Sequence, residues 1–147
     1  MTKGEQAKAL FEQGYNCAQS VACAYSEELG LPRDTVARMV SGFGGGMGRL
    51  REVCGAVSGI VFVYGTLRGY GAADAGEAKT ATYAAIQEMA AAFRGQTGSI
   101  VCRELLGLDR PEGTPQAEAR TPDYYRKRPC PELVALAADV LAAKLAE

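Results

Sequence analysis

Four of the five cysteines in this chain fall in the first turn of four different predicted helices, and this placement most constrains its fold. They are Cys17, Cys54, Cys102 and Cys130. The N-terminus of a helix presents unpaired N–H groups and about half a positive charge. Such a setting lowers a cysteine pKa from roughly 8.5 into the range of about 3.5–7.5. We therefore expect a fold that uses sulfur chemistry, whereas Cys23, in the middle of a predicted helix, is expected to be structural.

Apolar residues recur with a spacing near 3.6 along most of the chain, which predicts an all-α fold. We expect a single four-cysteine helical domain over residues 1–147, built as a multi-helix bundle. A central helix is predicted at about residues 53–68, because that segment is apolar on all sides. The other helices are predicted at about residues 2–13, 16–29, 34–43, 74–93 and 99–106 and from Pro129 onward. Met39 and Tyr83 are expected to face the core.

Glycines in the predicted central helix suggest close packing. Gly55, Gly59, Gly65 and Gly69 would let neighbouring helices approach the backbone. The first two belong to the sequence C-G-A-V-S-G at residues 54–59, where they would also admit a backbone or a substrate to the sulfur of Cys54. Arg49 and Arg51 precede this motif and are expected to raise the local electrostatic potential.

The composition excludes several function classes. The chain has no histidine, which removes Ser-His-Asp and Cys-His catalysis, the usual zinc sites that activate water, and c-type haem attachment. A net charge of −1 gives no drive toward nucleic acid. No predicted helix has the length and apolarity for membrane insertion, and no signal segment is evident. We expect a cytoplasmic protein, in which spaced cysteines suggest catalysis, redox sensing or metal binding.

Two connecting segments stand out. The glycine loop, residues 42–48, fits neither a Walker loop nor a dinucleotide-binding loop. It is interpreted either as a flexible connection between helices or as an anion-binding nest ahead of the Cys54 helix. Residues 107–128 are proline-rich and without periodicity, so they are expected to form a long connection of the kind that often carries function.

The cysteines contain no C-x-x-C pair, which argues against a thioredoxin-type site and a zinc ribbon. Only tertiary folding can bring sulfurs this far apart in sequence together, and four cysteines allow three disulfide pairings. We expect Cys17, Cys54, Cys102 and Cys130 to converge at one site.

At these residues the chain resembles the C_GCAxxG_C_C family, which is named for its cysteine pattern. The motif at residues 54–59 matches the hexapeptide of that family, and Cys17, Cys102 and Cys130 match the other three cysteine positions. The resemblance covers nearly the whole chain and implies redox activity. A related domain in split-Soret cytochromes is associated with an iron–sulfur centre, which makes cluster binding an alternative. Cys23 lies outside the pattern.

Three functions are therefore open. In the first, clustered cysteines carry out thiol–disulfide or electron-transfer chemistry with a thiol, disulfide or electron-transfer partner, and Cys54 is expected to attack. In the second, the same four thiolates bind an iron–sulfur cluster or a soft metal. In the third, the cysteines are packing residues in a structural or assembly protein. Whether the protein is an oxidoreductase and whether it forms a homodimer are left open.

Overall fold

The computed structural model describes residues 1–108 and 114–147, and these residues form the all-α fold that the sequence predicts. The intervening part of the predicted long connection, residues 109–113, lies outside the described residues. Over the described ranges, the β structure is limited to an isolated antiparallel bridge between Val53 and Val101. In the same ranges no helix is long and apolar enough to cross a membrane. The elements are α1 (Lys3–Glu12), α2 (Cys17–Cys23), α3 (Ser26–Leu29), α4 (Arg33–Val40), the 3₁₀ turn η1 (Ser41–Phe43), α5 (Gly55–Arg68), α6 (Glu77–Thr97), α7 (Cys102–Leu105), α8 (Pro122–Lys127) and α9 (Cys130–Leu145).

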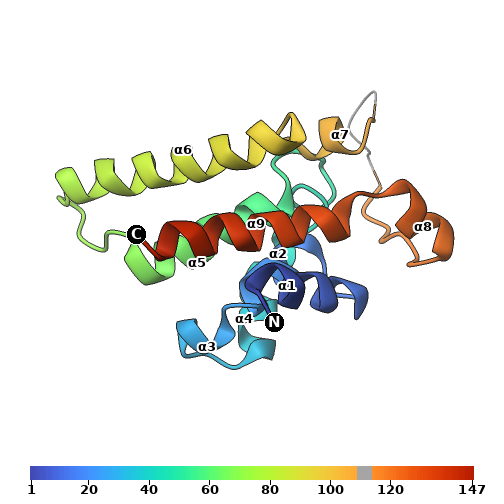
Figure 1. Cartoon of the computed structure of the whole chain (residues 1–147), viewed down its shortest axis with the longest axis horizontal. Coiled ribbons are helices and arrows are strands. Elements are labelled where there is room, and N and C mark those ends of the chain that lie inside the picture. Colours follow the sequence, from blue (N-terminus) through green and yellow to red (C-terminus); the bar gives the residue numbers. More distant parts are fainter. Residues whose placement is uncertain (109–113) are drawn as a thin grey trace.

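The predicted central helix is α5, which packs against α2, α6 and α9. Figure 1 shows α6 on one side of α5 and α9 and the N-terminal helices α1–α4 on the other, with α7 and α8 at one end. The enclosure is incomplete, because Val61 and Leu67 on α5 are 41% and 36% exposed. The largest fully buried side chains are Tyr25, Phe11, Phe93, Ile60, Met89 and Leu141.

Reciprocal side-chain caps fix the starts of the first two helices. The Thr2 hydroxyl accepts from the Glu5 N–H, and the Glu5 carboxylate accepts from the Thr2 N–H. Asn16 and Gln19 form the same box at the start of α2. Each box satisfies two backbone donors that a helix leaves unpaired at its N-terminus. The second box fixes the position of Cys17, the next residue in the chain.

Glycines allow α2 and α5 to cross closely, as predicted for two of the four positions. A Cβ atom at Gly59 would lie 2.9 Å from Val21 Cβ, and one at Gly55 would lie 3.2 Å from Cys17 Cβ. Gly65 faces open space, and the space at Gly69 is limited by the backbone of its own helix at Gly65. The expectation of close helix approach at Gly65 and Gly69 is therefore wrong.

The helix predicted over residues 16–29 is broken in two. The chain leaves α2 at Ala24 and starts α3 at Ser26, with Tyr25 at φ −108° and ψ 15° between them. The Tyr25 hydroxyl donates to the Ala138 carbonyl on α9 at 2.8 Å, and the Ser26 hydroxyl donates to the Cys23 carbonyl. Tertiary hydrogen bonding at Tyr25 thus overrides local helix propensity.

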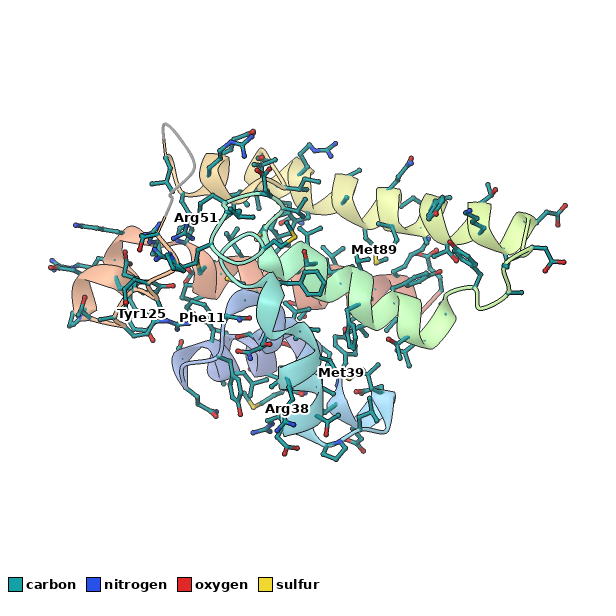
Figure 2. The ribbon with its side chains drawn as sticks, turned by 180° about the vertical axis from the view of Figure 1, so that it is seen from behind. Phe11, Arg38, Met39, Arg51, Met89 and Tyr125 are labelled. Atoms are coloured by element: carbon teal, nitrogen blue, oxygen red, sulfur yellow. The ribbon has the colours of Figure 1, made fainter. Side chains whose placement is uncertain are left out.

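Other expectations also need correction. Met39 and Tyr83 are 53% and 51% exposed rather than buried, and Figure 2 shows Met39 on the outside of α4. The helix predicted over 99–106 begins at Cys102, because Ser99 binds the Val101 N–H and the Glu104 carboxylate instead of capping the helix. Within the connection predicted to be irregular, α8 forms a short helix capped by Thr121.

Candidate functional site

All four predicted site cysteines stand at helix starts. Cys17, Cys102 and Cys130 are the first residues of α2, α7 and α9, and Cys54 is the N-cap residue of α5. All five cysteines of the chain are free thiols. The structure therefore places these four residues where the sequence pattern predicts them, within a residue or two.

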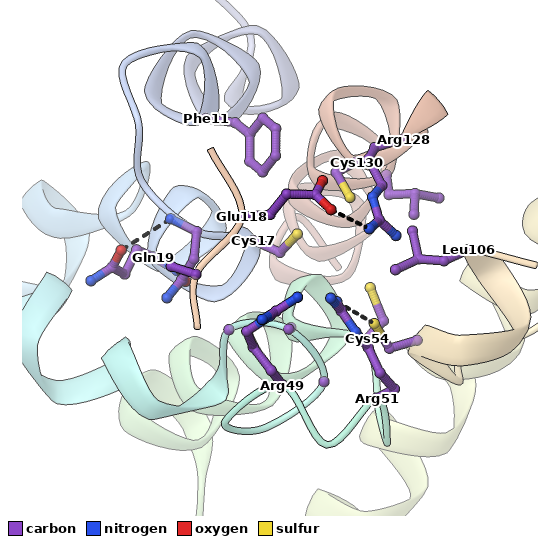
Figure 3. Close-up of a pocket in the computed structure, with 18 of the residues that line it drawn as sticks. Phe11, Cys17, Gln19, Arg49, Arg51, Cys54, Leu106, Glu118, Arg128 and Cys130 are labelled. Carbon is purple, nitrogen blue, oxygen red and sulfur yellow. Dashed lines mark hydrogen bonds and ion pairs between the residues drawn. The ribbon is translucent and has the colours of Figure 1, made fainter. Parts of the chain in front are cut away.

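The same four cysteines line one pocket of about 570 Å³. This volume lies within the range of about 300–1,000 Å³ that is usual for small-molecule sites. Figure 3 shows Cys17, Cys54 and Cys130, from three different helices, around a common space. The predicted convergence is thus present in the geometry. Cys23 does not line the pocket; it is buried, and its thiol donates to the Arg33 carbonyl.

Cys17 and Cys130 are the two pocket cysteines whose pKa values depend most strongly on each other. The interaction between the two thiols raises the pKa of Cys17 well above its ordinary value and lowers the pKa of Cys130. Arg128, Arg120 and Arg51 further lower the pKa of Cys130. Burial of Cys130 acts in the opposite direction but is outweighed. The pair therefore favours a Cys130 thiolate beside a Cys17 thiol.

Cys54 and Cys102 favour the protonated form. Burial raises the pKa of Cys54 to about 12, although the N–H groups of Ala56 and Val57 at the start of α5 act to lower it. Burial also raises the pKa of Cys102, against the influence of the Arg51 guanidinium. At Cys54 and Cys102 burial outweighs what the helix terminus supplies, and at Cys17 the interaction with Cys130 and burial do so, which leaves Cys130 as the helix start that favours a thiolate among the four.

Arginine side chains surround the sulfurs. The Arg51 guanidinium donates to Cys102 Sγ at 3.7 Å, and Arg128 donates to the Glu118 carboxylate at 3.0 Å. Figure 3 shows these two interactions on the same side of the pocket as Cys54. The sequence singles out Arg51 through its closeness to Cys54.

Arg120 is the residue that sequence reasoning misses. Its guanidinium donates to the Phe11 and Tyr15 carbonyls at 2.9 and 2.8 Å, and it stacks over the Phe11 ring at 4.0 Å. It also lies 5.0 Å from the centroid of the Tyr124 ring. Arg120 therefore ties the segment before α8 to the loop that leads into Cys17. No motif or periodicity marks it, because its partners are backbone carbonyls more than a hundred residues away.

The glycine loop is a tight left-handed turn that forms one wall of the pocket. Residues 45–49 all have φ between 57° and 70°, and this run includes the non-glycine residues Met47 and Arg49. The N–H groups of Met47, Gly48 and Arg49 donate to carbonyls within the loop, at Phe43, Gly42 and Gly44. These donors are thus used internally rather than aimed at an anion. A Cβ atom at Gly46 would lie 2.6 Å from Cys102 Cβ, so this position brings the loop against the site.

A metal or cluster needs several thiolates at bonding distance from one point. Among residues 1–108 and 114–147, no group of three or more Cys, Asp or Glu side chains is arranged to hold a metal ion. The four thiols share a pocket, but in this geometry they do not form a ligand set.

One of three comparisons with known proteins gave a match. The family model described as "Putative redox-active protein (C_GCAxxG_C_C)" matches residues 15–144, a range that contains all four pocket cysteines. The search of curated proteins and the search of solved structures found no match.

Proposed function

Because the chain belongs to the C_GCAxxG_C_C family, we propose that it is a thiol–disulfide oxidoreductase whose reacting pair is Cys130 and Cys17. The observation that carries this proposal is that the two cysteines share one pocket, where their interaction lowers the pKa of Cys130 while Cys17 keeps its proton. A thiolate is the attacking species in disulfide exchange, and a neighbouring thiol can resolve the mixed disulfide.

The assignment revises the expectation that Cys54 attacks. Cys54 is 4% exposed and its pKa is raised to about 12 by burial, so it is a poor nucleophile near neutral pH. Cys130 has arginines and a hydrogen-bond donor to stabilise its negative charge. Attack by Cys130 on a substrate disulfide releases one thiol, and attack by Cys17 on the mixed disulfide releases the second and leaves a Cys17–Cys130 disulfide. The partner is a thiol or disulfide compound small enough for the pocket, or an electron-transfer protein that reaches its mouth.

The test uses reduced, metal-free protein and oxidised glutathione as a probe disulfide. Rapid acid quench followed by peptide mass spectrometry reports which cysteine carries glutathione and which disulfide follows. We expect Cys130→Ser to abolish the rapid reaction and Cys17→Ser to accumulate glutathione on Cys130. Cys23→Ser is the matched control and should react like the unsubstituted chain. A rapid reaction that survives in Cys130→Ser would overturn the proposal.

The alternative function, binding of an iron–sulfur cluster or a soft metal, is tested on the same protein purified without oxygen. Its absorbance spectrum and its iron and zinc content distinguish the two functions. We expect no stoichiometric metal, because among the described residues no three Cys, Asp or Glu side chains in or near the pocket are arranged to hold one ion. One cluster per chain with a visible absorbance band, lost on Cys54→Ser, would replace the redox proposal by the cluster-binding alternative.

A further inference from the structure

We infer that Cys54 and Cys102 form a second dithiol, which takes over the disulfide made between Cys17 and Cys130. The inference rests on the function proposed above and gives a role to the two pocket cysteines which that function leaves unused. The site would then hold two disulfides, formed in two successive oxidations, before it has to be reduced again.

Backbone pairing brings Cys54 and Cys102 together. Each follows one residue of the Val53–Val101 bridge, and two hydrogen bonds fix the pairing: Cys54 N–H to the Ile100 carbonyl at 2.8 Å and Cys102 N–H to the Glu52 carbonyl at 2.6 Å. In such a bridge Cys54 and Cys102 are diagonal neighbours on the same face, a relationship that in a regular ladder separates Cα atoms by about 7–8 Å. A disulfide needs roughly 4.4–6.8 Å. A small movement of the four-residue helix α7 would close the bond.

Cys17 links this second dithiol to the first. Gly55, the residue after Cys54, lies so close to α2 that a Cβ atom on it would be 3.2 Å from Cys17 Cβ and 3.2 Å from the Ala18 nitrogen. Cys17 in turn interacts with Cys130, and all four cysteines line one pocket. Cys17 therefore lies between the Cys54 end of α5 and the partner Cys130 of the first pair.

Cys102 at the far end of this sequence is held in place on two sides. The Arg51 guanidinium donates to its sulfur at 3.7 Å, and the loop residue Gly46 packs against its Cβ atom. Cys102 is 8% exposed and Cys54 is 4% exposed, whereas Cys17 is half-buried. Cys130 is 7% exposed, so Cys17 is the member of the first pair, and of the four pocket cysteines, that is most open to a substrate.

The transfer of the disulfide from the first pair to the second needs no oxidant or reductant other than the substrate disulfide. Cys54 first releases its proton to water, and the resulting thiolate attacks the Cys17 sulfur of the Cys17–Cys130 disulfide, so that Cys130 leaves as a thiolate. Cys102 then loses its proton and attacks the Cys54 sulfur, and Cys17 leaves and takes up a proton. The net result of a full cycle is that one substrate disulfide is reduced to two thiols while Cys54 and Cys102 are oxidised to a disulfide.

The number of thiols released tests the inference. Reduced protein is treated with excess oxidised glutathione without any other reductant, and reduced glutathione is counted per chain. We expect four for the unsubstituted chain and for Cys23→Ser, because two disulfides form. The Cys54→Ser/Cys102→Ser variant should release two. Release of only two from the unsubstituted chain, with Cys54 and Cys102 still reduced, would overturn the relay and leave the proposed function standing.

A second variant shows whether the route runs through the first pair. In Cys17→Ser/Cys130→Ser, Cys54 and Cys102 should stay reduced over the time in which the unsubstituted chain is oxidised. If they are oxidised equally fast, the substrate reaches them directly and the relay is wrong.

The unsubstituted chain provides a test that no folding defect can obscure. One equivalent of oxidised glutathione is added, and samples are quenched and mapped over time. We expect the Cys17–Cys130 disulfide to appear first and then to decline as the Cys54–Cys102 disulfide grows. A Cys17–Cys130 disulfide that persists unchanged would contradict the transfer.

Discussion

Cys17 and Cys130, at the starts of the packed helices α2 and α9, line the same pocket, and their interaction raises the pKa of Cys17 and lowers that of Cys130. Although the two side chains are chemically identical, Cys17 therefore keeps its proton while Cys130 favours the thiolate.

Alkylation of Cys130 should reach half its maximum rate at a lower pH than alkylation of an ordinary cysteine, for which the pKa is about 8.5. The pKa of Cys130 is lowered, so its reactivity rises with pH and levels off before that value. Cys17→Ala removes the interaction with Cys17, which contributes most to the lowered pKa of Cys130, and should therefore shift the pH profile of Cys130 alkylation to higher pH. The measurement is iodoacetamide labelling of the Cys130 peptide against pH, and an unshifted profile in Cys17→Ala would contradict the assignment.

Arg120→Ala should destabilise the fold by about 2–3 kcal/mol, since hydrogen bonds from a charged group contribute roughly 1.5–3 kcal/mol and two carbonyls lose their donor. Arg126→Ala is the matched control on the same segment, because its side chain is 74% exposed and it pairs with Asp123 on the same helix. Urea unfolding measures both free energies of unfolding. Equal effects of the two substitutions would show that Arg120 does not hold the segment in place.

Gly59→Ala should cost about 1–3 kcal/mol, because the new methyl group would meet Val21 and the Ala18 carbonyl at 2.9 and 3.1 Å. Gly65→Ala, in the same helix but facing open space, should instead stabilise it by up to about 1 kcal/mol. Thermal unfolding of the two variants gives the comparison. A destabilised Gly65→Ala would mean that the exposed side of α5 is covered in solution.

Met47→Gly and Met39→Gly should have opposite effects on stability. Met47 lies in the left-handed region at φ 70°, where a non-glycine residue costs about 1–2 kcal/mol, so glycine relieves strain there. Met39 lies in α4, where glycine in place of methionine costs up to about 1 kcal/mol. Both side chains are about half exposed, so their burial differs little. Chemical unfolding of the two variants checks the sign of each change.

Cys23→Ala should leave the redox reaction intact and reduce stability by about 1 kcal/mol, because it removes a buried sulfur and one weak hydrogen bond to the Arg33 carbonyl. Glutathione release and thermal unfolding report the two quantities separately. Loss of the reaction to the extent seen in Cys130→Ser would place the fifth cysteine in the site.

Local signals account for most of what could be predicted. Asn16 followed by Gln19 is a capping box, and Pro131 suits a first helical turn, so the starts of α2 and α9 were predictable. Thr121 followed by Pro122 is the same kind of signal, and it marks α8, which was missed. Short helices of this length leave no periodicity to detect.

Tertiary contacts account for the rest. The break at Tyr25 depends on the Ala138 carbonyl of a distant helix. The choice of Cys130 over Cys54 depends on which sulfurs meet and how deeply each is buried, and neither is encoded in the C-G-A-x-x-G motif. Sequence spacing identified the set of cysteines, whereas the division of roles among them required the fold.

The pairing of α2 with α9 also has a consequence during synthesis. A chain emerging from the ribosome presents Cys17 early, but its partner Cys130 arrives only with α9, which also packs along α1 through the hydrogen bond from the Gly4 N–H to Asp139. Until α9 docks, Cys17 lacks the Cys130 sulfur with which it interacts in the folded site. The lowered pKa of Cys130 therefore appears only together with the completed core.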